Sequence, residues 1–229
     1  MKIAGYVKNS LIDYPAHISC AVFLGGCNFD CWYCHNRSYI KGQGDIESET
    51  VLEFLKRRKG LIQGVVVSGG EPTLNAELPD FLIKIKEMGY LVKLDTNGSR
   101  PKIVKDIISQ GLVDYIAMDY KAPLEKYPEI VHVNVNINDI KESIDTILAS
   151  NIDYEFRTTF VPTLIDEDIV KIAKEISSSK KYCLQQYRHE DEYSKILGKE
   201  VRPHTPEYIR QTAQKLKDFF NGELIIRGL

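Results

Sequence analysis

The chain has 229 residues, and its 30 Lys and Arg against 32 Asp and Glu leave a formal net charge of −2. Basic side chains are scattered, so the positive patch of a nucleic-acid-binding protein is missing. No apolar run approaches the roughly 20 residues of a membrane-spanning helix. We therefore expect a cytoplasmic protein with a single domain over residues 1–229, which binds neither nucleic acid nor membranes.

From residue 18 onward, short apolar or β-branched runs alternate with segments of helical periodicity. Ser48 and Asn138 stand where N-caps are expected. The secondary structure of segment 122–137 stays undecided, because its alternating valines fit either an edge strand or an extended loop. The predicted strands are 18–24, 64–67, 90–94, 115–118, 154–161, 182–186 and 224–226, and the predicted helices are 49–58, 78–88, 101–110, 139–150, 166–178 and 206–220.

This alternation indicates parallel βαβ units with right-handed crossovers. A complete eight-unit barrel takes about 250 residues, so a chain of 229 residues with long loops is short for it. We expect an α/β fold, a partial and laterally open (β/α)6 barrel. In such folds functional residues lie in loops after the carboxyl ends of the strands.

Three of the five cysteines, Cys27, Cys31 and Cys34, follow the first predicted strand with the spacing C-x3-C-x2-C. Three thiolates can hold a [4Fe–4S] cluster and leave its fourth iron open to a ligand. The alternative is structural Zn²⁺ bound by these cysteines and His35. Zinc sites usually draw ligand pairs from two separated knuckles, which favours the cluster. Cys20 and Cys183 stand in apolar surroundings and are predicted to be inert buried thiols.

Further polar motifs follow the other predicted strands, at residues 68–72 (Ser-Gly-Gly-Glu-Pro), 95–98 (Asp-Thr-Asn-Gly), 119–121 (Asp-Tyr-Lys) and 185–186 (Gln-Gln). Two glycines permit close backbone approach to a ligand, and a nearby carboxylate could accept from an ammonium group. Arg157 lies inside an apolar strand, so it needs a carboxylate partner from the protein or from a ligand. All these motifs are expected at one edge of the sheet.

Together these motifs resemble the radical S-adenosylmethionine (SAM) superfamily over nearly the whole chain. The ordered combination of C-x3-C-x2-C, with an aromatic residue before the last cysteine, and a later strand ending in Gly-Gly-Glu-Pro carries the resemblance. Within the superfamily, segments 10–15, 34–36, 156–162 and 184–188 look like glycyl-radical-enzyme activating proteins. The likeness is greatest to those of the anaerobic ribonucleoside-triphosphate reductase.

The resemblance implies reductive cleavage of SAM to a 5′-deoxyadenosyl radical, which takes a hydrogen from a glycine of a partner glycyl radical enzyme. It implies an electron donor of the reduced flavodoxin or ferredoxin type. Cys27, Cys31 and Cys34 would hold one [4Fe–4S] cluster, with the methionyl amine and carboxylate on its fourth iron. The other implied cofactor contacts are Tyr33 at the adenine, the backbones of Cys34 and His35, Gly69, Gly70 and Glu71 at the amine, and Asp95, Asn97, Asp119, Lys121 and Arg157 near the ribose and carboxylate.

Two further predictions depend less directly on these motifs. Asp95, Thr96 and Asp119 could hold a monovalent cation beside the cofactor. Pyruvate formate-lyase activators carry a Tyr-His pair on the last strand where this chain has Gln-Gln, so Gln186 could replace that histidine at the nucleoside.

Two other functions remain as alternatives. One is a radical SAM enzyme that acts on a small molecule and resembles the 7-carboxy-7-deazaguanine synthases. The other is a non-catalytic zinc-binding module. Segments 34–36 and 185–188 favour the activating protein.

Overall fold

A computed structural model of the protein describes residues 1–42, 44–198 and 200–229, which group into two compact units. The first unit comprises Met1–Asn28, Asn36–Ala117 and Asn138–Asp153. The second comprises Phe29–His35, Met118–Ile137 and Tyr154–Leu229. Strand β6 (Tyr115–Asp119) is shared, because its residues up to Ala117 belong to the first unit and its last residues to the second.

The first unit contains five further strands, in the order β3-β1-β2-β4-β5. Strands β2, β4 and β5 are parallel, with Ala21 opposite Val66 and Val66 opposite Lys93. Strand β1 was not predicted; it is mostly exposed and lacks an apolar run, and it pairs antiparallel with β2 and β3. The bounds are β1 Lys2–Ser10, β2 Ser19–Leu24, β3 Ile46–Glu47, β4 Gly64–Gly69 and β5 Leu91–Thr96.

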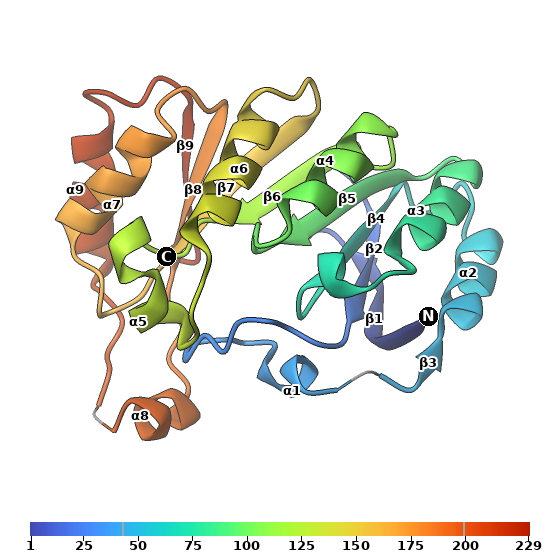
Figure 1. Cartoon of the computed structure of the whole chain (residues 1–229), viewed down its shortest axis with the longest axis horizontal. Helices are drawn as coiled ribbons and strands as arrows, with labels where there is room; N and C mark the ends of the chain where they lie inside the picture. The colour runs from blue at the N-terminus through green and yellow to red at the C-terminus, as the bar shows by residue number, and fades with distance from the viewer. Residues whose placement is uncertain (43, 199) are drawn as a thin grey trace. The chain divides into compact units, whose positions relative to one another are not determined.

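The helices of the first unit each bury one apolar stripe, as Val51, Leu52 and Leu55 of α2 do. Helices α2 and α3 lie side by side (Figure 1). The predicted N-caps are one and two residues too late, because Ser48 is the first residue of α2 and Asn138 is the second residue of α6. The bounds are α1 Arg37–Ile40, α2 Ser48–Arg57, α3 Leu78–Glu87, α4 Pro101–Ser109 and α6 Ile137–Leu148, with a 3₁₀ turn η1 at Pro72–Leu74.

One face of this sheet changes from apolar to polar along the strands. Near their amino ends Ala21 and Val66 pack with Tyr115 and with Tyr14, which comes from the loop after β1. Lys93 lies at the same level of the sheet as Val66; its ammonium is 6.0 Å from the centre of the Tyr115 ring and pairs with Asp95, which is two residues further along β5. The apolar packing closes the amino end of this face and leaves polar side chains at the carboxyl end.

In the second unit the strand order is β6-β7-β8-β9, and β7, β8 and β9 pair in parallel. Helices α7 and α9 lie side by side (Figure 1). Both alternatives for segment 122–137 are wrong for most of its length, because it forms η2 and then α5, which buries Ile130 and Val131. Only its residues 122–123 and 132–136 form neither helix nor strand. The bounds are β7 Asp153–Phe160, β8 Lys181–Gln186, β9 Glu223–Arg227, α5 Tyr127–Val131, α7 Asp166–Glu175, α8 Asp191–Leu197 and α9 Pro206–Leu216, with a 3₁₀ turn η2 at Leu124–Lys126.

Successive strand residues point to opposite faces of a sheet. In the second unit one face packs against helices, as Phe160 stacks on Tyr208 of α9 with ring centroids 5.7 Å apart. The opposite face of β7 carries Glu155 and Arg157. The strand order begins at β3 and ends at β9, so the predicted α/β fold with an open sheet is confirmed.

No helix in the described ranges has both the length and the apolar character that crossing a membrane requires. The predicted single domain over residues 1–229 stays a prediction.

The buried ion pair of β7 and β9 gives a test of the second unit. Arg227 donates to both carboxylate oxygens of Glu155, at 2.8 and 2.6 Å, and Glu155 is 1% exposed. Arg227→Met would leave a buried carboxylate without its partner, so we expect a loss of about 3 kcal/mol in the free energy of unfolding. Chemical denaturation measures this loss.

The matched control is Arg202→Met, because Arg202 pairs with Glu200 at the surface and its side chain is 82% exposed. An exposed pair contributes about 0–1 kcal/mol. Equal losses in the two variants would contradict a structural role for the Glu155–Arg227 pair.

Candidate functional site

The loop after β4 is joined through its backbone to the start of the cysteine loop. The Gly70 amide donates to the Leu24 carbonyl and the Glu71 amide to the Gly26 carbonyl, both at 2.8 Å. A Cβ atom on Gly70 would lie 2.0 Å from the Gly26 carbonyl oxygen, and Gly69 has a φ of +118°. We expected these glycines to admit a ligand; the structure shows that they admit the chain's own backbone.

Asn36 adds a side-chain link between the same loops, since its Nδ2 donates to the Gly69 carbonyl at 3.1 Å. It was not among the predicted site residues. It does stand in the Cys-His-Asn segment at 34–36, which was the available pointer. The Gly-Gly-Glu loop is therefore attached to residues on both sides of the cysteine motif in the sequence.

Glu71 is a buried hub of this loop, with 1% of its surface exposed. Its Oε1 accepts from the Thr73 amide at 3.0 Å, the Thr73 hydroxyl at 2.5 Å and the Thr96 hydroxyl at 2.8 Å. Its Oε2 accepts from the Asn97 amide at 2.6 Å. Burial raises the pKa of Glu71, and these hydrogen bonds act in the opposite direction. The carboxylate thus fixes the end of β5 to the end of β4.

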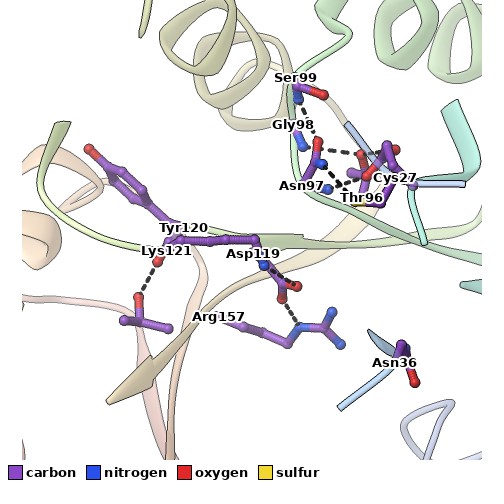
Figure 2. A network of polar contacts seen from close by, with 12 residues as sticks. Cys27, Asn36, Thr96, Asn97, Gly98, Ser99, Asp119, Tyr120, Lys121 and Arg157 are labelled. Atoms are coloured by element: carbon purple, nitrogen blue, oxygen red, sulfur yellow. Dashed lines mark hydrogen bonds and ion pairs between the residues drawn. The ribbon is translucent and has the colours of Figure 1, made fainter. Parts of the chain in front are cut away.

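Asn97 in turn contacts the first cysteine (Figure 2). Its Nδ2 lies 4.0 Å from Cys27 Sγ and 3.0 Å from the Asn28 side-chain oxygen. Its Oδ1 accepts from the Ser99 amide at 2.9 Å, and Asn28 Nδ2 donates to the Ser99 hydroxyl at 2.8 Å. The turn after β5 is therefore held in a defined position at Cys27.

The predicted cation ligands of the first unit already have protein partners. Asp95 pairs with the ammonium of Lys93 at 2.5 Å, and the Lys93 side chain is 3% exposed. The Thr96 hydroxyl donates to Glu71 and accepts from the Gly98 amide at 3.1 Å. Lys93 supplies a positive charge at Asp95, and the monovalent cation stays a prediction.

In the second unit, Asp119 lies between two cations (Figure 2). Arg157 Nε is 2.8 Å from Asp119 Oδ1, and Lys121 Nζ is 3.2 Å from Asp119 Oδ2. The sequence left open whether the carboxylate partner of Arg157 belongs to the protein; it is Asp119. Burial by itself would raise the pKa of Asp119, but Arg157 and Lys121 outweigh it and lower this pKa to about 2.

Two of the motif cysteines belong to the same unit as this charged group. Cys31 is buried, Cys34 is half-buried, and the Cys34 amide donates to the Cys31 carbonyl at 3.1 Å. The Lys121 ammonium lies 6.0 Å from the centre of the Tyr33 ring. Burial opposes the charge of Lys121, yet Asp119, Tyr33 and the two cysteines raise its pKa well above the usual value. A permanent cation therefore accompanies Cys31 and Cys34.

The segment around Cys31 and Cys34 rests on aromatic side chains that the sequence did not identify. Trp32, the single tryptophan of the chain, is fully buried; its ring centroid lies 5.6 Å from that of Tyr187 and 6.3 Å from that of Tyr193. His35 directs Nδ1 to Glu190 at 3.0 Å and to the Tyr193 hydroxyl at 3.2 Å. The segment after β8 thus supports the cysteine loop.

Burial raises the pKa of Tyr33 itself, so its ring stays neutral.

In residues 1–42, 44–198 and 200–229, no three His, Cys, Asp or Glu side chains are grouped so that they could hold a metal ion. Cys20 and Cys183 are fully buried as predicted, and burial raises their pKa values to about 12 and about 11.

The two glutamines that end β8 point to opposite faces of the sheet. Arg157 is opposite Cys183 and Thr159 is opposite Gln185, so Gln185 shares the face of Arg157. Gln186 points to the other face, where its Nε2 donates to the His204 carbonyl at 3.0 Å. The strand register favours Gln185 over the predicted Gln186 as a neighbour of the Asp119 group.

The contact at Gly70 predicts a steric effect. Gly70→Ala places a methyl group against the Gly26 carbonyl, so we expect a loss of about 1–3 kcal/mol of stability from overpacking. Thermal denaturation followed by circular dichroism measures it. The control is Gly42→Ala, whose Cβ would lie 3.6 Å from the Ser38 carbonyl oxygen, in ordinary contact. A melting temperature that is unchanged in Gly70→Ala would contradict the backbone contact.

The lowered pKa of Asp119 predicts an acid-dependent stability. Because this pKa is about 2 in the folded state against an ordinary value of 3.8, the carboxylate stabilises the fold above pH 3.8, and this contribution is lost as the pH falls toward 2. We expect it to be about 1–2 kcal/mol, given the partial exposure of Asp119.

Arg157→Gln removes one of the two cations beside Asp119, so the pKa of Asp119 rises. Its carboxylate then stabilises the fold less at neutral pH than in the wild type. The variant should melt below the wild type at pH 7, and the gap between the two melting temperatures should narrow from pH 4 to pH 2. Arg202→Gln is the control. A gap that stays constant with pH would show that the Asp119–Arg157 pair is not its source.

Comparisons with known proteins agree with this geometry. The family model described as the Radical SAM superfamily matches residues 21–176. A protein of Methanocaldococcus jannaschii named as a glycyl-radical enzyme activating enzyme is 36% identical over 236 residues, covering 97% of this chain and 95% of that protein. The pyruvate formate-lyase-activating enzyme of Clostridium pasteurianum is 31% identical over 182 residues, covering 73% of each chain.

A solved structure shows the same fold at low sequence identity. Streptococcus suis SuiB bound to its precursor peptide SuiA superposes with a TM-score of 0.74 at 13% identity, over 91% of this chain and 48% of SuiB. This chain therefore spans about half the length of SuiB. The family match, the full-length relative and the cysteine and Gly-Gly-Glu loops agree, and the protein is a radical SAM enzyme that belongs to the Radical SAM superfamily.

Proposed function

We propose that this protein activates a glycyl radical enzyme, with the anaerobic ribonucleotide reductase as its partner. The observation that carries the proposal is the attachment of the cysteine loop to the Gly-Gly-Glu loop through Gly26 and Asn36. The relative named as an activating enzyme supports it, because the similarity extends over 97% of this chain.

The donor set fits an iron–sulfur cluster. Cys27, Cys31 and Cys34 are reduced thiols, and the charge of Lys121 accompanies two of them, which suits thiolates on an anionic cluster. A cluster is larger than a single ion, so its three thiolates need not converge on one point. When bound, the cluster would supply one electron to SAM; the other tasks belong to the chain's own residues.

The chain would bind the methionyl end of SAM through its backbone as much as through carboxylates. Glu71 already accepts four hydrogen bonds, and a carboxylate has about four lone-pair sites. We assign Glu71 the task of holding the loop, so that the backbone of Gly69 and Gly70 receives the amine. Three of the four hydrogen bonds share Oε1, so the side chain would contribute at most the second lone pair of Oε2, which accepts from the Asn97 amide.

The charged group of the second unit would orient the rest of the cofactor. Arg157 and Lys121 would attract the methionyl carboxylate, and Asp119 would accept from ribose hydroxyls. Tyr33 would pack on the adenine, Cys34 and His35 would offer backbone contacts, and Asp95 and Asn97 would also contact the cofactor. Gln185, rather than Gln186, would approach the nucleoside. Solvent exclusion around these groups would protect the radical.

The reaction balances with one external electron. One electron enters the sulfonium, its bond to C5′ breaks, and methionine and a 5′-deoxyadenosyl radical result. The radical removes a hydrogen atom from a glycine Cα of the partner, which yields 5′-deoxyadenosine and the glycyl radical. A reduced flavodoxin or ferredoxin would supply the electron. The cytoplasmic location stays a prediction.

The deciding experiment loads the protein anaerobically with iron and sulfide, reduces it, and adds SAM with candidate glycyl radical enzymes. We expect the electron paramagnetic resonance doublet of a glycyl radical on anaerobic ribonucleotide reductase, and one 5′-deoxyadenosine for each radical formed. SAM cleavage without a radical on any candidate would contradict the activating function and favour a small-molecule substrate. A protein that takes up one Zn²⁺ and no sulfide would overturn every radical mechanism.

Cysteine variants provide the matched control for that experiment. Cys27→Ser, Cys31→Ser and Cys34→Ser should each lose bound iron and the glycyl radical signal. Cys20→Ala should retain both, because Cys20 is a fully buried thiol of β2 outside the motif.

A further inference from the structure

We infer that Asn97 tunes the reduction potential of the iron–sulfur cluster through an N–H···S hydrogen bond to the thiolate of Cys27. This inference rests on the proposed function, since it requires a cluster on Cys27. The contact is the 4.0 Å separation between Asn97 Nδ2 and Cys27 Sγ, which is the outer range for a hydrogen bond to sulfur.

The orientation of the Asn97 amide follows from its partners. The Ser99 backbone N–H can only donate, so the atom that it contacts at 2.9 Å must be the side-chain oxygen of Asn97. The side-chain nitrogen then faces Cys27 and the oxygen of Asn28, which accepts from it at 3.0 Å. The N–H groups of Asn97 are thus directed at the sulfur by the network itself.

Asn97 is also held rigidly enough to keep this contact. Its side chain is buried, and its backbone amide donates to the buried Glu71 at 2.6 Å. Ser143 of α6 fixes the next residue by donating to the Gly98 carbonyl at 2.6 Å. Because the donor is preorganised, little ordering entropy opposes the hydrogen bond.

The chemical consequence has a definite sign. Reduction adds negative charge to the cluster and its thiolates, so a donor at one thiolate stabilises the reduced form more than the oxidised form. Asn97 therefore raises the reduction potential and eases reduction of the cluster by the external electron donor. In this role it is a positioning residue that acts through Cys27.

The test is a redox titration of the cluster-loaded wild type, Asn97→Ala and Asn97→Asp, followed by electron paramagnetic resonance of the reduced cluster. At a fixed poise, we expect Asn97→Ala to lower the ratio of reduced to oxidised cluster about tenfold, which is about 59 mV for a one-electron couple. Asn97→Asp should lower it further, because it replaces the donor by a negative charge.

The control is Asn75→Ala, which removes an asparagine of the first unit whose Oδ1 accepts from the Glu77 amide. It should titrate as the wild type does. Iron and sulfide content and the melting temperature confirm that each variant is loaded and folded. Equal potentials for the wild type and the loaded Asn97 variants would overturn the inference.

A second measurement detects the hydrogen bond directly in the cluster-loaded wild type. With ¹⁵N in the asparagine side-chain amides, pulsed electron paramagnetic resonance of the reduced wild type should detect a ¹⁵N coupling, and Asn97→Asp should remove it. A wild type without this coupling contradicts the hydrogen bond. A protein that binds no cluster contradicts the proposed function instead, so the two failures are distinguishable.

Discussion

The hydrogen bonding of the buried carboxylate of Glu71 is the interaction on which the polar loops of the first unit depend. The carboxylate accepts four hydrogen bonds and joins the loop after β4 to the turn after β5. Through Asn97 the same network reaches Cys27. A buried carboxylate is stable only when such donors replace water. Glu71 therefore shapes the loops, and this explains why a charged residue occupies a position without solvent contact.

The second unit solves a comparable electrostatic problem with ion pairs. Asp119 is flanked by Arg157 and Lys121, and Glu155 is paired with Arg227. All but Lys121 belong to strands β6, β7 and β9, and Glu155 shares the Arg157 face, opposite the side of β7 that packs on α9. Each of these charges has a partner of opposite sign, and this pairing offsets the cost of removing the charges from water in a partly buried setting. A sulfonium cofactor with an amine and a carboxylate would suit such a mixture of charges.

These features place the radical chemistry of the superfamily on a chain that otherwise resembles an ordinary α/β protein. The match to the superfamily covers residues 21–176, which include the cysteine loop, the Gly-Gly-Glu loop and Arg157. The remaining C-terminal part contributes β8, β9 and the aromatic residues under Trp32. In this part Gln185 and Arg227 are opposite each other in register and therefore share one polar face of the sheet.

The sequence alone determined the alternation of strands and helices and the three cysteines, because apolar periodicity and ligand spacing are local properties of the chain. It also located Glu71 and Asp119 after strand ends and Arg157 inside a strand. The tertiary structure decided what those residues touch: Arg157 pairs with Asp119, Gly70 packs on Gly26, and Gln185 shares a face with Arg157 while Gln186 does not. Strand β1 and the Trp32 contacts also appeared only there, since pairing partners and register depend on residues far apart in the sequence.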